Sequence, residues 1–386
     1  MNRMTAQPDG TGALDLDGEH IDLSTDSIET TRAQLMKRVV AHAAEQRASV
    51  PMTAEDATGT WHLLVHPNGE VEQVDAPAEH LPNPFAQTFI KPHHAEPVAP
   101  TTSGGFLRSL FGMNEPNEAE RAEAADKHAV AHVWTLPKNI AVANPKGGCG
   151  KTPTTICLAA MFARFGGGMV LAQDNNVTRG TLGWRTESAR HGATMADLRA
   201  ELDALTGTER AADMARFTHH QTGDRFDVLQ SVPKKLSTDQ ALTDDEFDQV
   251  QQLLARFYRM TIFDSGNDES ASMWLRMIHH ADALVVPTST APDRLETASL
   301  MLAELAEQGG HAAFLARNAV VVVMHASTNE PAPERIVPLF KGARAVLPIP
   351  HDPAMASNWL RWDSLAPATQ RAWLTVGAAV ARGLED

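Results

Sequence analysis

The chain has 386 residues, and the 43% of them that are hydrophobic supply enough apolar surface for a folded core, which excludes a wholly disordered protein. Its two cysteines, Cys149 and Cys157, exclude a disulfide-rich secreted scaffold and favour a reducing compartment. The formal net charge is −15, and residues 1–136 carry most of it, with 20 Asp and Glu against 9 Lys and Arg, so this part is not expected to bind nucleic acid.

The chain is predicted to begin with a disordered acidic tail, residues 1–26, in which Gly, Asp, Ser and Thr are prominent. Residues 27–76 are predicted to form a small module of one helix and a β-hairpin. Ser27 caps a helical pattern that runs to about residue 47, and the hairpin turns at Asn68-Gly69, where both residues tolerate a positive φ.

Residues 77–116 are predicted to form a linker, because six prolines between residues 77 and 103 favour an extended chain. Within it, residues 104–113 (GGFLRSLFGM) form a short amphipathic pattern. A membrane surface, a partner protein or the next domain could each cover its apolar side.

Residues 117–386 are predicted to form one α/β domain with a doubly wound, mostly parallel sheet. Continuously apolar strands such as 283–287 and 319–324 are typical of a parallel sheet covered on both faces. The predicted strands are 138–143, 169–173, 226–231, 260–264, 283–288, 318–324 and 345–349. The predicted helices are 117–133, 153–165, 194–216, 237–257, 268–280, 292–308, 331–340 and 364–384.

The residues 145–152 read Pro-Lys-Gly-Gly-Cys-Gly-Lys-Thr, between a β-branched strand pattern and a helical pattern. Glycines let the backbone approach an anion, and the N–H groups of such a loop and of the following helix point at it. We therefore predict a phosphate-binding loop in which Lys151 reaches the β- and γ-phosphates and the Thr152 hydroxyl holds Mg²⁺. The other residues expected to contact the nucleotide here are Gly147, Gly148, Cys149, Gly150 and Pro153.

The pattern KGGxGKT, with Lys146 before two glycines, resembles the deviant Walker A motif of the ParA/MinD family of ATPases, over about residues 138–386. This resemblance implies a P-loop NTPase that sandwiches ATP and Mg²⁺ between the two subunits of a homodimer. The family's early lysine crosses to the partner's nucleotide, which is the role implied for Lys146.

Two later segments also resemble this family. Asp264-Ser-Gly266 ends an apolar strand like the Walker B and switch II segment, which implies Asp264 near Mg²⁺ and Gly266 near the γ-phosphate. The loop 347–353 is similar to one that borders the base, which implies Pro350 in nucleotide binding.

The segment 170–176 departs from the family where switch I is expected. Asp174 keeps the first carboxylate, but Asn176 stands where relatives have the Asp that positions the attacking water. An amide can hold water but is a poor proton acceptor. Hydrolysis is therefore expected to be slow, to depend on Asp174 or a partner, or to be absent. The polar loop 178–185 that follows is either nucleotide-responsive or an ordinary surface loop.

Two functions stay open on the sequence. The first is an ATP-dependent switch for partition or positioning of a plasmid, chromosome or other cargo, which can include non-specific DNA contact and association with the nucleoid. The second is a weakly hydrolytic regulatory adaptor of a secretion, conjugation or pilus system. Because the chain has no apolar run of about 18 residues, a bacterial cytoplasmic protein without membrane association is expected.

Overall fold

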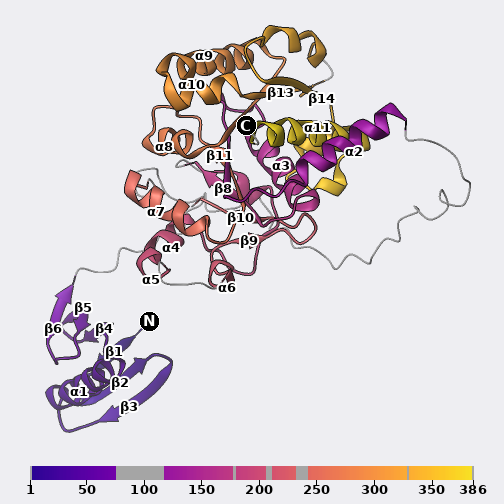
Figure 1. The fold of residues 1–386 in the computed structure, drawn as a ribbon. Coiled ribbons are helices and arrows are strands. Elements are labelled where there is room, and N and C mark those ends of the chain that lie inside the picture. Colours follow the sequence, from indigo (N-terminus) through magenta and orange to yellow (C-terminus); the bar gives the residue numbers. More distant parts are fainter. Residues whose placement is uncertain are drawn as a thin grey trace, which may run out of the picture. The chain divides into compact units, whose positions relative to one another are not determined.

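The structure, a computed structural model, describes residues 2–74, 117–176, 180–205, 211–231, 242–327 and 330–384 (Figure 1). The chain divides into two compact units, residues 1–89 and 90–386, which we call the N-terminal and C-terminal units. The linker predicted over 77–116, with its amphipathic segment, lies outside the described residues.

The N-terminal unit is a six-stranded sheet with one helix packed on it, in the strand order β3-β2-β1-β4-β5-β6. The central strands β1 and β4 are parallel, and the other neighbours are antiparallel. The helix and the β5–β6 hairpin lie where the sequence predicts a helix and a hairpin. The elements are β1 (Arg3–Ala6), β2 (Thr11–Leu16), β3 (Glu19–Ser24), α1 (Ile28–Gln46), β4 (Val50–Asp56), β5 (Gly59–Val65) and β6 (Val71–Val74).

The prediction of a disordered tail over residues 1–26 is wrong, because this segment forms β1, β2 and β3. Along β2, Leu14 and Leu16 are buried while Asp15 between them is exposed. Asp17 and Gly18 join β2 to β3 with φ values of 48° and 90°, the conformation that a two-residue hairpin requires. Asp15 and Asp22 therefore lie on the exposed side of a folded strand pair.

The C-terminal unit is built on an eight-stranded sheet with the order β14-β13-β12-β7-β11-β8-β10-β9. All neighbouring strands are parallel except β9, which is antiparallel to β10, so the predicted doubly wound, mostly parallel sheet is confirmed. The strands are β7 (Lys138–Val142), β8 (Val170–Asn175), β9 (His219–His220), β10 (Asp227–Leu229), β11 (Met260–Ser265), β12 (Ala283–Ser289), β13 (Val320–Met324) and β14 (Ala345–Ile349).

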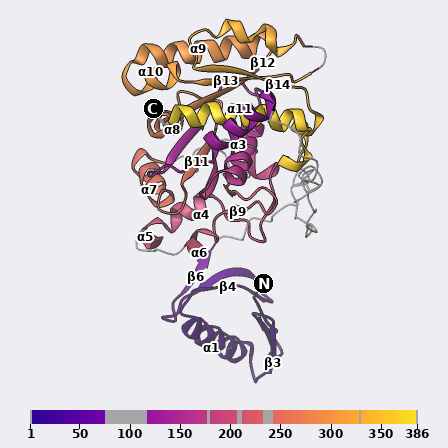
Figure 2. The same ribbon diagram turned by 45° about the vertical axis from the view of Figure 1, so that its right-hand side comes forward.

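Helices cover both faces of this sheet (Figures 1 and 2). On β7, Ile140 and Val142 pack toward α3 and α11, while Ala141 packs toward the helices of the other face, because side chains alternate along a strand. The helices are α2 (Glu118–Val130), α3 (Lys151–Phe165), α4 (Met195–Ala200), α5 (Leu202–Leu205), α6 (Ala211–Met214), α7 (Asp244–Leu254), α8 (Ser272–His280), α9 (Pro292–Gln308), α10 (Gly310–Arg317) and α11 (Pro367–Leu384).

The helix α2 packs on α11 through two ion pairs that share one buried carboxylate. Asp126 on α2 accepts from Arg371 at 2.9 Å and from Arg382 at 2.8 Å, and both arginines belong to α11. These contacts attach α2 to the C-terminal unit. In the described part of the chain, no helix has the length and apolar character needed to span a bilayer.

Two predicted helices differ from the structure, and one observed helix was not predicted. The predicted helix 194–216 is divided into α4, α5 and α6, and 331–340 forms two short 3-10 turns, η4 (Pro333–Arg335) and η5 (Val337–Leu339), since prolines interrupt it. The helix α10 was not predicted. It begins after Gly309, whose φ of 76° ends α9 and turns the chain into a second helix.

Candidate functional site

A cleft of about 540 Å³ lies at the carboxyl ends of the parallel strands, where the loops after β7, β11, β13 and β14 meet. Ligands of open α/β sheets bind at this edge. The cleft is lined by these residues of the predicted site: Gly147, Gly148, Cys149, Gly150, Lys151, Thr152, Pro153, Asn176, Asp264 and Pro350. The predicted residues Lys146, Asp174 and Gly266 do not line it.

The loop between β7 and α3 has the conformation that its glycines allow. Gly148 and Gly150 have φ values of 78° and 88°, and Gly150 is the residue at which α3 begins. A Cβ at Gly150 would lie 2.5 Å from the end of the Met324 side chain, which would have to shift, and the positive φ of Gly150 would strain any other residue. The residues at the start of α3, Lys151 to Pro153, line the cleft, and the N–H groups that a helix N-terminus leaves free favour an anion there.

Lys151 is buried in the loop, with 9% of its surface exposed. Its Nζ donates to the Asn144 carbonyl oxygen at 2.7 Å, to the Lys146 carbonyl oxygen at 3.2 Å and to Asn267 Oδ1 at 2.6 Å. All three acceptors are neutral, and burial lowers the pKa of Lys151. The ammonium therefore lies in an environment that an anionic ligand would stabilise.

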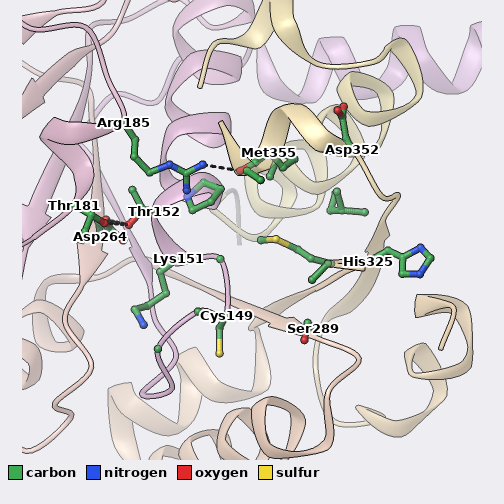
Figure 3. A pocket seen from close by; sticks show the side chains of 18 of the residues that line it. Cys149, Lys151, Thr152, Thr181, Arg185, Asp264, Ser289, His325, Asp352 and Met355 are labelled. Carbon is green, nitrogen blue, oxygen red and sulfur yellow. Dashed lines mark hydrogen bonds between the residues drawn. The ribbon is translucent and has the colours of Figure 1, made fainter. Parts of the chain in front are cut away.

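Thr152 and Asp264 form the candidate Mg²⁺ site (Figure 3). The Thr152 hydroxyl donates to Asp264 Oδ2 at 2.6 Å and lies 3.1 Å from the Thr181 hydroxyl. The second carboxylate oxygen of Asp264, Oδ1, is buried and has no hydrogen-bond partner among the residues that the structure describes. A hydroxyl beside an unsatisfied carboxylate oxygen fits Mg²⁺, which takes few protein ligands and completes its shell with water and phosphate oxygens. Thr152 and Asp264 are the residues that would hold the ion.

Asp174 lies beneath the cleft, side by side with Asp264 in the register of β8 and β11. Its Oδ2 accepts from the Ser231 hydroxyl at 3.0 Å, and its Oδ1 accepts from the backbone N–H of Asn176 at 3.2 Å. Burial, and then the neighbouring charge of Asp264, raise the pKa of Asp174, and burial raises the pKa of Asp264 as well. Each carboxyl group therefore holds a proton more readily in the ligand-free fold than it would in water.

Asn176 lines the cleft close to Gly266, since a Cβ at Gly266 would lie 3.4 Å from the side-chain oxygen of Asn176. Lys146 instead points out of its own cleft, since its Nζ pairs with Asp293 Oδ2 at 3.1 Å and 47% of its side chain is exposed. Cys149 is buried, and burial raises the pKa of its thiol, as expected of a small side chain that fills space.

The sequence analysis missed two residues of the site, Arg185 and Asn267. Asn267 follows Gly266 directly and holds the ammonium of Lys151. Arg185 ends the polar loop 178–185 and sends its guanidinium into the cleft (Figure 3). The polar character of that loop was the available signal, but it did not single out one residue.

Comparisons with known proteins were made by sequence and by structure. No family model matches the chain. The ESX-1 secretion-associated protein EspI of Mycobacterium tuberculosis is 28% identical over 253 residues, which cover 64% of this chain and 36% of EspI. The chain thus spans about a third of the length of this curated relative.

Solved structures that resemble the chain include a ParA family ATPase of Chlorobium tepidum, at 18% identity and a TM-score of 0.49, covering 65% of this chain and 97% of that one. Another is the septum site-determining protein MinD of Pyrococcus horikoshii with Mg-ADP, at 17% identity and a TM-score of 0.47, covering 63% of this chain and 95% of that one. In the structure, residues 145–152 lie between β7 and α3 of a mostly parallel sheet, which is the strand, loop and helix order that the sequence predicts.

Proposed function

We propose that the chain binds ATP with Mg²⁺ at its phosphate loop and forms an ATP-sandwich homodimer that acts as a switch in positioning or partition. The observation that carries this proposal is the meeting of Lys151, Thr152 and Asp264 around one loop, with a buried carboxylate oxygen left unsatisfied. Bound Mg²⁺ would neutralise charge on the β- and γ-phosphates. Non-specific DNA and a cargo protein are the partners, and the cytoplasm or nucleoid the location, that this function implies.

The orientation of Lys146 supports the homodimer. Its ammonium faces away from the cleft of its own subunit, and its ion pair with Asp293 is half exposed on both sides. An exposed pair of this kind stabilises a fold by about 0–1 kcal/mol, so little free energy is needed to release the lysine toward a second subunit.

Lys146→Ala is expected to weaken ATP-dependent dimerisation by at least about tenfold while leaving ATP binding to the monomer nearly unchanged, because it removes a charge-assisted contact made only across the interface. Sedimentation velocity with Mg-ATP, Mg-ADP and no nucleotide measures the mass. Lys127→Ala, at an exposed lysine that pairs with Glu123 on α2, is the matched control. If the wild-type mass does not change with nucleotide, the homodimer is contradicted.

A second candidate function is a weakly hydrolytic adaptor of a secretion system. Asn176 lines the cleft where the family resemblance implies a water-positioning carboxylate, and the matching Mycobacterium tuberculosis protein is named as secretion-associated. Neither observation bears on DNA, and the amide of Asn176 suits a protein that hydrolyses its ATP slowly.

Steady-state ATP turnover separates the two functions. For the adaptor we expect hardly any turnover in the wild type and a gain of about tenfold or more in Asn176→Asp, because a carboxylate restores a proton acceptor beside the water. Asn176→Ala is the control for side-chain volume and is expected to stay inactive. Robust turnover that Asn176→Ala leaves unchanged and that DNA stimulates would favour the partition switch.

A further inference from the structure

The side chain of Arg185 is partly buried in the cleft and has no carboxylate partner in the described part of the chain. Arg185 lies between β8 and α4, and its guanidinium reaches the cleft between Thr152 and Met355 (Figure 3). Its Nη2 donates to the carbonyl oxygens of Met355 at 2.6 Å and Ser357 at 2.9 Å, and its Nε donates to Ser357 at 3.2 Å. Its Nη1 takes no part in these bonds.

The electrostatic environment of Arg185 is unfavourable without a ligand. Burial lowers the pKa of Arg185, and among the described residues no Asp or Glu lies within ion-pair distance of it. A nearby arginine shows the usual arrangement, since Arg164 on α3 pairs with Asp224 at 2.9 Å and with Asp363 at 2.7 Å. Because buried charges are normally paired, an unpaired guanidinium that faces an anion site points to an anionic ligand as the missing partner.

We propose that Arg185 binds the non-terminal phosphates, those that ADP and ATP share, of a nucleotide held in the cleft of its own subunit. This inference rests on the proposed nucleotide binding at the phosphate loop. Lys151 and Asn267 occupy the end of the loop assigned to the γ-phosphate, whereas Arg185 is anchored to the segment after β14 that follows Pro350. That places the guanidinium between the phosphate loop and the side of the cleft assigned to the base.

The guanidinium is held in place before any ligand arrives. Besides the three side-chain bonds, the amide of Leu360 donates to the carbonyl oxygen of Arg185 at 3.1 Å. The chain segments after β8 and after β14 are thereby joined, since Arg185 follows β8 and Leu360 follows β14. A fixed guanidinium loses little conformational entropy on binding. Nearly all of the energy of its contact with phosphate therefore adds to the free energy of binding.

The test compares Arg185→Gln, Arg185→Lys and the control Arg361→Gln, an arginine that stacks on Trp359 and does not line the cleft. Displacement of a fluorescent ADP analogue measures the affinities of ADP, ATP and adenosine. We expect Arg185→Gln to lower the affinities for ADP and ATP by the same factor, about 10- to 100-fold, because a charge-assisted contact with phosphate is lost. The affinity for adenosine, which has no phosphate, is expected to stay unchanged. Arg185→Lys is expected to lose less affinity for ADP and ATP than Arg185→Gln does. Arg361→Gln is expected to keep the wild-type affinities.

A purely structural role for Arg185 gives a different pattern. In that case the melting temperature of ligand-free Arg185→Gln falls, and the affinity for adenosine falls together with that for ADP. Our proposal instead expects a melting temperature that is unchanged or raised, since an unpaired buried charge is removed. Unchanged ADP affinity in Arg185→Gln, or a loss confined to ATP, overturns the proposal while nucleotide binding itself stands. If the wild type binds no nucleotide at all, the proposed function fails first, and this inference fails with it.

Discussion

Lys151→Ala is expected to lower the affinity for ATP by at least about a hundredfold. The ammonium is held inside the loop by two backbone carbonyl oxygens and by Asn267 Oδ1, at 2.6–3.2 Å, and all of these are weaker partners than phosphate. Charge-assisted hydrogen bonds contribute about 1.5–3 kcal/mol each, and two of them to phosphate oxygens account for a loss of this size. Isothermal titration with Mg-ATP measures the change.

Two comparisons make the result for Lys151 specific. Lys127→Ala, at the exposed pair with Glu123, is expected to bind ATP like the wild type. Ligand-free Lys151→Ala is expected to unfold at nearly the wild-type temperature, because the lysine is a buried charge with only neutral acceptors and its loss costs the fold little. Tight ATP binding by a folded Lys151→Ala variant would show that the nucleotide does not lie on this loop.

The phosphate loop could be predicted from the sequence because its chemistry is local. Residues 145–152 are contiguous, and their glycines and terminal Lys-Thr fix the backbone path and the ligand together. Asp264 could be included in the predicted site because it ends an apolar strand, and the carboxyl ends of parallel strands share one edge of the sheet. The observed hydrogen bond between Thr152 and Asp264 joins residues 112 positions apart.

The contacts of Arg185 could not be predicted in this way. Its carbonyl partner Met355 is 170 positions away, on a loop whose path depends on how β14 and η6 (Pro353–Ala356) close the cleft. The composition of the loop gives no signal for such a contact, since arginines are also common in loops that make none. The burial that makes this arginine unusual exists only once the loops after β8 and β14 meet.

The error over residues 1–26 has another physical cause. Composition averages the two sides of a strand, so exposed acids such as Asp15 and Asp22 concealed the buried Leu14 and Leu16. The alternation along Leu14 to Leu16 and the Asp17-Gly18 turn were the local signals of a hairpin. Composition identifies disorder reliably only where such alternation is missing.

Asp174→Asn is expected to stabilise the ligand-free C-terminal unit at neutral pH and to have little effect at pH 5. Burial, followed by the charge of Asp264, raises the pKa of Asp174 to about 7, against roughly 4 in an unfolded chain. Between these values the folded state binds one proton more than the unfolded state. The wild type therefore loses stability as the pH rises from about 5 to 8, whereas an amide at this position does not titrate.

The measurement is the difference in the free energy of unfolding between Asp174→Asn and the wild type, from urea titrations at pH 5, 6, 7 and 8 with a chelator present. We expect it to grow with pH by roughly 1–3 kcal/mol. Asp268→Asn is the control, because Asp268 is exposed and a hydrogen bond from Ser270 lowers its pKa, so its difference should stay flat over this range. Adding Mg-ATP should shrink the Asp174→Asn difference, since a cation beside Asp264 offsets the repulsion between the two carboxylates. A difference that does not change between pH 5 and 8 would mean that Asp174 ionises in the fold as readily as in water.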